Sequence, residues 1–220
     1  MAILKLYGSS FATCTRRVGA VLHELKIPFE LVSVDVMNGA HKTPEYLEKQ
    51  PFGQIPYIDD DGFILYETRA ICRYLAAKYP ASGLIPTDPK ANALFEQAAS
   101  VEVSNFDPSA SKAGFQLMMK GFGSPYDQAV VDAQLEILDK KLEGYEAILS
   151  KQRYVAGDYI FGQNFTLVDL FHIPYAPLVA SGGSDIMTRK PNVARWYNEL
   201  VARPSWLAYK DTGVQTTTEY

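Results

Sequence analysis

Hydroxyl and thiol side chains gather at an expected helix start near the beginning of the chain, in Thr13, Cys14 and Thr15. A thiolate held at a helix start is stabilised by the helix dipole and by hydroxyl donors, which can lower a thiol pKa from about 8.5 to below neutrality. Threonine is also a common helix cap, and an isolated cysteine is more often a buried, unreactive thiol. The pattern alone therefore leaves helix capping and thiol chemistry both open.

A second expected helix start follows a strand-like run that ends at Tyr66. Thr68 lies where free backbone N–H groups and the positive end of the helix dipole converge, an environment that suits a bound carboxylate. Glu67 and Thr68 can equally serve as caps of this helix. On the residues alone, capping is the favoured interpretation.

The run Gln54-Ile55-Pro56 places a proline within a strand-like segment. A cis peptide before Pro56 would turn the chain and expose the backbone of Ile55 to a ligand, but only about 5–6% of X-Pro bonds are cis. Because proline is tolerated at the edge of a sheet, the residues alone favour a trans proline there.

The histidines give only a weak signal. His41 and Lys42 lie in a polar loop and offer two donors for a carboxylate, as many exposed loops do. His23 and His172 fall within expected helices and are interpreted as structural. Because the three histidines share no ligand spacing, no metal site is expected.

The elements that must position these residues change in character after residue 80. Residues 1–80 alternate strand and helix signals in the order β-α-β-α-β-β-α, which predicts an α/β domain. Residues 81–89 are rich in proline and are expected to be a linker. Residues 90–220 carry only helical patterns and predict an all-α domain, and the stretch after Lys210 is expected to be loose.

Composition narrows the class of protein. The 220 residues carry a formal net charge of −4, which disfavours nucleic acid as the main partner. No apolar run reaches the roughly 20 residues that a membrane helix needs, so no membrane association is expected. With only two cysteines, Cys14 and Cys72, no disulfide framework is predicted, and a reducing, cytoplasmic location is expected.

Taken together, these motifs resemble one family, the phi-class glutathione transferases. Its motifs match, in order and spacing, Thr15-Arg16-Arg17-Val18, Gly39-Ala40-His41-Lys42, Pro51-Phe52-Gly53-Gln54-Ile55-Pro56 and Glu67-Thr68-Arg69-Ala70-Ile71. The segments Phe165–Asp169 and Pro191–Trp196 are also similar to that superfamily. The resemblance implies the cytosolic glutathione transferase fold, with a thioredoxin-like N-terminal domain and an all-α C-terminal domain.

The resemblance also implies a binding site for glutathione as co-substrate, with no metal or organic cofactor. Glu67 and Thr68 would hold the γ-glutamyl end, and Ile55, before a cis Pro56, would pair with the cysteinyl backbone. The glycine carboxylate would face three side chains, those of His41, Lys42 and Gln54.

A hydrophobic electrophile would be the second substrate, and peroxide reduction is a further implied activity. The expected electrophile site is an apolar cleft lined by Phe11, Ala12, Phe115, Met118, Met119, Phe122 and Tyr175, although each of the large side chains could equally belong to the core. The resemblance further implies a homodimer.

One position departs from the family pattern. The thiol-activating serine of the family corresponds to Ala12, which has no hydroxyl. Losing one preorganised donor can cost about 10² to 10³ in rate. The candidates to replace it are Thr13, favoured because its hydroxyl and N–H both lie at the helix start, and also Ser10 and Cys14.

This departure keeps three alternatives open. The chain could be a glutathione-binding carrier with little turnover, a Cys14-dependent thiol transferase, or an interaction module like the family's relatives in translation elongation factors. Real glutathione binding is favoured over a purely structural role, because the chain keeps an intact set of polar residues from the implied site: His41, Lys42, Gln54, Glu67 and Thr68.

Overall fold

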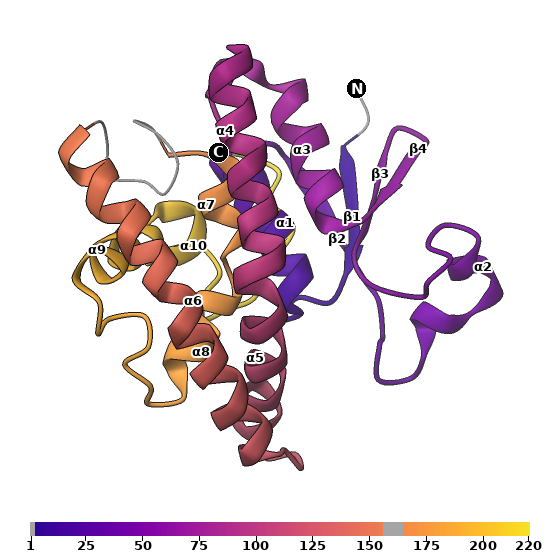
Figure 1. Ribbon diagram of the computed structural model, residues 1–220. Helices are drawn as coiled ribbons and strands as arrows, with labels where there is room; N and C mark the ends of the chain where they lie inside the picture. The colour runs from indigo at the N-terminus through magenta and orange to yellow at the C-terminus, as the bar shows by residue number, and fades with distance from the viewer. Residues whose placement is uncertain (1–2, 156–164) are drawn as a thin grey trace. The chain divides into compact units, whose positions relative to one another are not determined.

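The computed structural model describes residues 3–155 and 165–220, which form two compact units (Figure 1). The first unit combines Met1–Ser82 with Arg203–Tyr220, and the second comprises Gly83–Ala202. These bounds differ from the expected domains, because Arg203–Tyr220 belongs with the first unit instead of the helical one. The physical reason is a set of hydrogen bonds and buried contacts between this segment and the N-terminal residues, described below.

The first unit contains a four-stranded mixed sheet in the order β2-β1-β3-β4, in which β1 and β2 are parallel and the other pairs antiparallel. Its strands are β1 (Leu4–Gly8), β2 (Phe29–Ser33), β3 (Tyr57–Asp60) and β4 (Phe63–Tyr66). Its helices are α1 (Thr13–Glu24), the short turn η1 (Ala40–Lys42), α2 (Pro44–Leu47), α3 (Thr68–Lys78), η2 (Pro80–Ser82) and α10 (Pro204–Leu207). The thioredoxin-like fold and the element order β-α-β-α-β-β-α are confirmed.

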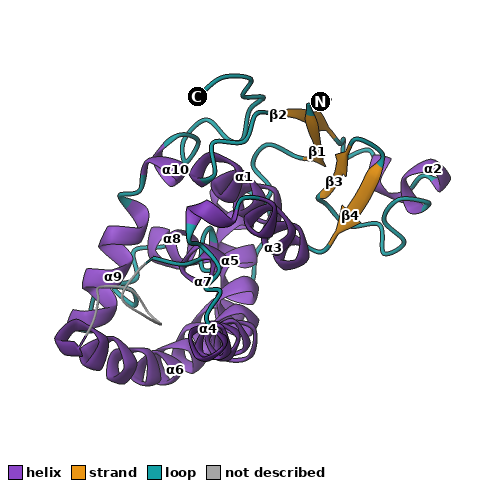
Figure 2. Cartoon of the chain, turned by 90° about the horizontal axis from the view of Figure 1, so that it is seen from above, coloured by secondary structure: helices purple, strands orange, loops and turns teal. Residues whose placement is uncertain are grey.

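Hydrophobic side chains on both faces of the sheet hold this unit together. On one face α1 and α3 lie side by side, and their buried residues include Val18, Leu22 and Ile71 (Figure 2). On the other face Tyr46 of α2 packs against Tyr57 of β3. The sheet thus brings the start of α1, the segment before β3 and the start of α3 to one end.

The second unit is helical throughout the part that the structure describes, as expected. Its elements are α4 (Pro89–Val101), a π-helical turn η3 (Glu102–Phe106), α5 (Asp107–Gly121), α6 (Gln128–Val155), α7 (Leu167–Phe171), α8 (Tyr175–Ser181) and α9 (Pro191–Val201). Among residues 3–155 and 165–220, no helix is both long and apolar enough to cross a bilayer.

A capping box begins α7, where Thr166 stands three residues before Asp169, the spacing typical of that motif. The Asp169 carboxylate accepts hydrogen bonds from the Thr166 N–H at 2.9 Å and from the Thr166 hydroxyl at 3.1 Å. Its other oxygen accepts the indole N–H of Trp196 at 3.0 Å, which ties α7 to α9. His172 is fully buried beside Tyr145, 3.1 Å from its hydroxyl, which is consistent with its structural interpretation.

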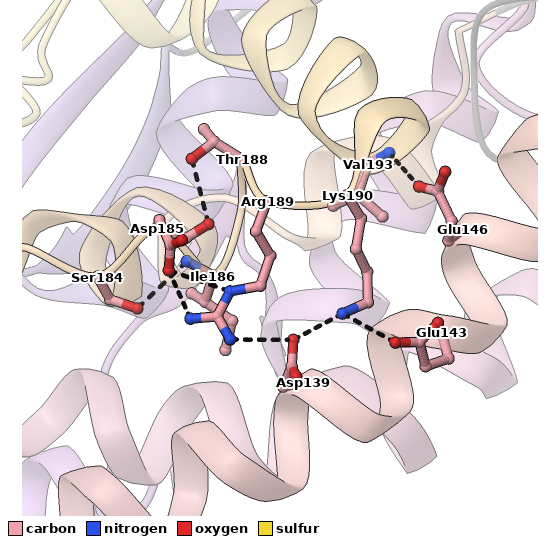
Figure 3. Close-up of polar contacts among 10 residues, drawn as sticks. All are labelled: Asp139, Glu143, Glu146, Ser184, Asp185, Ile186, Thr188, Arg189, Lys190 and Val193. Carbon is pink, nitrogen blue, oxygen red and sulfur yellow. Dashed lines mark hydrogen bonds and ion pairs between the residues drawn. The ribbon is translucent and has the colours of Figure 1, made fainter.

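Charged side chains connect α6 to the segment before α9 (Figure 3). The Lys190 ammonium, on a largely buried side chain, lies 2.7 Å from Asp139 and 3.1 Å from Glu143. Three residues after Glu143 on α6, Glu146 accepts the N–H groups of both Asn192 and Val193 at 3.0 Å. Because Lys190 at the N-cap of α9 makes no side-chain cap of its own, a carboxylate from another helix fills that role.

We expect Glu146→Ala to lower the free energy of unfolding by about 1–3 kcal/mol, because it leaves the first N–H groups of α9 without an acceptor. Urea denaturation followed by circular dichroism measures this. Glu136→Ala is the matched control on the same helix, because Glu136 forms an exposed ion pair with Lys140, and such surface pairs contribute little. Equal losses in the two variants would contradict the capping role of Glu146.

The stretch after Lys210 is ordered as part of the first unit and pairs with β2, so the expectation of a loose tail is wrong. The N–H groups of Phe29 and Thr217 each donate to the carbonyl of the other, at 2.8 and 3.0 Å. Strand β2 is the edge of the sheet, where backbone groups would otherwise lack partners. The tail supplies those partners.

Candidate functional site

Three segments from different parts of the first unit meet in a small pocket at one end of the sheet. The residues lining it are Cys14, Gln50, Gln54, Ile55, Pro56, Glu67 and Thr68. Five of them are residues expected to bind glutathione, and Cys14 is a candidate for thiol chemistry. The fold therefore brings together residues that are more than 50 positions apart in the sequence.

The peptide bond between Ile55 and Pro56 is cis. The trans form favoured by the residues alone is therefore wrong, and the cis form implied by the family resemblance is confirmed. Ile55 lies two residues before the start of β3 at Tyr57. Among the described residues, its main-chain N–H and C=O make no hydrogen bond. Its N–H and C=O groups therefore remain able to pair with an extended peptide, as a neighbouring strand would.

Glu67 adopts a backbone conformation that is rare outside glycine, with φ 68° and ψ 110°. Such conformations cost about 1–3 kcal/mol and are concentrated at functional sites. Neither Glu67 nor Thr68 caps α3 through its side chain, so the capping interpretation favoured on the residues alone is wrong. The Thr68 hydroxyl instead accepts a hydrogen bond at 3.3 Å from the guanidinium of Arg17, a fully buried side chain of α1.

Gln50 is a pocket residue that the sequence reasoning missed. Its buried side-chain carbonyl accepts the N–H of Gln54 at 3.1 Å, and the Tyr46 hydroxyl donates to the Gln54 carbonyl at 2.8 Å. Burial and the neighbouring Tyr57 hold the pKa of Tyr46 well above its usual range, so this hydroxyl keeps its proton. Hydrogen bonds therefore hold both the N–H and the carbonyl of Gln54.

His41 and Lys42 lie in η1, outside the small pocket, and contact the segment that leads into it. The Lys42 ammonium donates to the Phe52 carbonyl at 3.2 Å. Gly53 has φ 57°, and a Cβ there would lie 2.7 Å from the Lys42 nitrogen and 2.9 Å from the His41 carbonyl. Only glycine fits this close approach. The buried Nδ1 of His41 has no hydrogen-bond partner among the described residues.

At the start of α1, Ala12 is the N-cap residue, with an extended backbone and no side-chain cap. Thr13 and Cys14 follow as the first two residues of the helix, and both are half-buried. The Ser10 hydroxyl donates at 2.7 Å to the carbonyl of Val214, so its hydrogen is already engaged. Among the three candidate donors, this geometry disfavours Ser10.

The two cysteines are both free thiols in different surroundings. Cys72 is fully buried in α3, and burial raises the pKa of its thiol to about 12, which makes it unreactive. Only Cys14 lines the pocket.

The residues expected to contact the electrophile come from both units. Phe11 is half exposed in the first unit, at the loop before α1. In the second unit, Tyr175 begins α8, and Gly114 of α5 lies beneath it: a Cβ at Gly114 would come within 3.2 Å of the Tyr175 ring. The remaining candidates belong to α5 or follow it directly, and they are Phe115, Met118, Met119 and Phe122. A cleft shared by these side chains stays a prediction.

Family models match both halves of the chain. The N-terminal domain of glutathione S-transferases matches residues 6–83, and the C-terminal domain of the same family matches residues 106–204.

Individual relatives cover most of the chain. It is 45% identical to glutathione S-transferase PM239X14 of Arabidopsis thaliana, with 90% of this chain and 91% of that protein covered. It is 43% identical to glutathione S-transferase hmp2 of Hypomyces subiculosus, with 93% and 96% covered. Among solved structures, glutathione transferase F2 of Populus trichocarpa superposes with a TM-score of 0.86 at 36% identity, covering 94% and 97% of the two chains. Maize glutathione S-transferase I, in complex with an atrazine–glutathione conjugate, gives a TM-score of 0.84 at 32% identity, covering 96% and 100%.

Proposed function

This chain belongs to the glutathione S-transferase family, and on that premise we propose that it binds glutathione in the pocket at the starts of α1 and α3, in the manner of a phi-class enzyme. The activity is the family's: the enzyme joins the glutathione sulfur to an electrophile. The observation that carries the proposed site is the pocket itself, which unites Cys14, Ile55, cis-Pro56, Glu67 and Thr68.

The two ends of the tripeptide would meet groups of suitable charge. The γ-glutamyl carboxylate would lie at the first turn of α3, where N–H groups have no helical acceptor, and its amino group would face the Glu67 carboxylate. The glycine carboxylate would be held by three side chains, those of His41, Lys42 and Gln54. Between the two ends, the cysteinyl backbone would pair with the main chain of Ile55.

The sulfur would then lie at the start of α1. Ala12 offers no hydroxyl, so the thiolate would be stabilised by the first-turn N–H groups of α1 and by the Thr13 hydroxyl. The thiol loses its proton to solvent, the sulfur forms a bond to an electrophilic carbon, and a leaving group departs or a double bond takes up the electron pair. Orientation and thiolate stabilisation carry this reaction, so the proposal includes no metal or organic cofactor.

Two experiments test this function together. Calorimetry measures glutathione affinity, and conjugation to a chromogenic aryl halide measures turnover. Saturable binding with turnover supports the proposal. Binding without turnover would make the protein a carrier, and the absence of binding would favour an interaction module.

A second candidate activity is thiol transfer through Cys14, and the observation that favours it is that Cys14 lines the same pocket. In this reaction the Cys14 thiolate attacks a mixed glutathione disulfide and releases the substrate thiol. A second glutathione then attacks the enzyme-bound disulfide, which releases oxidised glutathione and restores Cys14.

We expect Cys14→Ser to retain conjugation within about twofold, because Cys14 lines the pocket but is not proposed to stabilise the glutathione thiolate. The measurement compares conjugation with glutathione-dependent reduction of a small disulfide, using Cys72→Ser as the control. Loss of disulfide reduction alone would establish thiol transfer as a second activity. Loss of conjugation in Cys14→Ser, with conjugation retained in Cys72→Ser, would contradict the proposed role of the α1 start.

Further properties follow as proposals from family membership. We propose a homodimer, a cytoplasmic location and hydrophobic electrophiles, the last supported by the atrazine conjugate bound to the maize relative. Peroxide reduction stays a prediction.

A further inference from the structure

The C-terminal segment Arg203–Tyr220 reaches the loop Ser9–Ala12, which leads into α1. The Val214 N–H donates to the Ser10 carbonyl at 3.0 Å, and the Ser10 hydroxyl donates to the Val214 carbonyl at 2.7 Å. One residue of the loop and one residue of the segment therefore hold each other through two hydrogen bonds. Val214 is completely buried.

Gly213 permits this close approach. It has φ 73°, and a Cβ there would lie 2.3 Å from the Ser10 hydroxyl oxygen and 3.2 Å from the Phe11 ring. On the other side, Val214 covers Gly19 of α1, where a Cβ would lie 2.8 Å from the valine side chain. Val214 is therefore wedged between the loop and the helix, and any side chain at position 213 would press on the loop.

The same segment also contacts the first turn of α1 through Arg16. The Arg16 guanidinium donates to the Lys210 carbonyl at 2.6 Å and lies 4.6 Å from the centre of the Trp206 ring. The Tyr209 hydroxyl donates to the Arg16 carbonyl at 2.8 Å, and burial holds the pKa of Tyr209 well above its usual range, so this donor stays protonated. Loop and helix start are thus fixed by one element.

We propose that residues 206–214 of this segment are a positioning element of the active site, which holds the loop Ser9–Ala12 so that the first N–H groups of α1 face the glutathione sulfur. This inference rests on the proposed place of the sulfur. Because Ala12 has no hydroxyl, the proposed stabilisation of the thiolate relies on the Thr13 hydroxyl and on first-turn N–H groups whose direction the loop sets. A displacement of about 1 Å at such a site can cost about 10²-fold in rate.

Gly213→Ala tests the proposal, because the added methyl group pushes directly on Ser10 and Phe11. We expect kcat/KM for conjugation to fall by about tenfold or more. We also expect the acidic limb of the pH–rate profile to move to higher pH, because misdirected donors favour the thiolate less and so raise the thiol pKa.

Thr216→Ala is the matched control in the same segment. The Thr216 hydroxyl accepts the Leu31 N–H at 3.0 Å, so its hydrogen-bond partner lies on β2 and not in the loop. This variant should keep the wild-type kcat/KM and pH profile. A wild-type kcat/KM and profile in Gly213→Ala as well would overturn the proposal.

The double variant Ser10→Ala/Gly213→Ala separates positioning from direct catalysis by Ser10. Ser10→Ala removes the oxygen that the new methyl group would meet, so the double variant should be no slower than Gly213→Ala alone. Additive losses would overturn the proposal, because they would make Ser10 a direct donor to the sulfur.

If Gly213→Ala does not fold, the single variant Ser10→Ala tests the proposal. It should raise the pH of the acidic limb and speed amide hydrogen exchange in residues 9–14, and a wild-type result in both would overturn the proposal. Failure of the proposed function is distinguishable, because it would show in the wild-type enzyme as absent glutathione binding.

Discussion

Ala12→Ser is expected to raise kcat/KM for conjugation by about ten- to a hundredfold. The extended backbone of Ala12, with φ −66° and ψ 134°, is one in which serine is common at an N-cap. Its hydroxyl would add a donor to the thiolate at the start of α1, and one preorganised donor is worth about 10² to 10³ in rate. Because a donor favours the charged form, the thiol pKa should fall and the acidic limb of the pH–rate profile should move to lower pH.

Two companion variants make this test specific. Thr13→Val removes the hydroxyl proposed to act in the absence of serine, and its rate should fall. Ala91→Ser adds a hydroxyl near the start of α4 in the second unit and should change nothing. An unchanged rate and pH profile in Ala12→Ser would show that the sulfur does not lie at the start of α1.

Glu67→Gln is expected to weaken glutathione binding by about ten- to a hundredfold, since hydrogen bonds to charged groups contribute about 1.5–3 kcal/mol. The change removes the charge proposed to meet the γ-glutamyl amino group and keeps the shape of the side chain. It also keeps a non-glycine residue at φ 68°, so the backbone conformation is not relaxed. Calorimetry with purified enzyme measures the affinity.

A glutathione analogue without the α-amino group gives this prediction its control. It should bind the wild type and Glu67→Gln equally, because the lost interaction is already absent. Glu48→Gln, an exposed residue after α2, should not affect either ligand. If the analogue discriminates between wild type and Glu67→Gln as strongly as glutathione does, the amino group lies elsewhere.

Local patterns in the sequence determined most of the fold. Alternation of strand and helix signals predicted the first unit, and the spacing of apolar residues predicted the helices of the second. The capping box at Thr166 and Asp169 was also readable, because its hydrogen bonds join residues three positions apart. The type and order of the elements that flank the pocket were therefore fixed by interactions within short segments.

Residue types along the chain also predicted most of the residues that line the pocket. Ile55, Glu67 and Thr68 were expected there, and the structure brings them together with Cys14. Gln50 was missed because its role depends on a hydrogen bond within an irregular loop, for which no periodic pattern exists.

Only the tertiary structure decided the features that depend on contacts between distant residues. The cis peptide before Pro56 opposes the general preference for trans, and the Thr68 hydroxyl meets the buried Arg17 from another helix. The engagement of Ser10 by Val214 joins residues separated by 204 positions. A single sequence carries local propensities, whereas the partner of a hydroxyl or of an edge strand is selected by packing, which places Arg203–Tyr220 beside the start of α1.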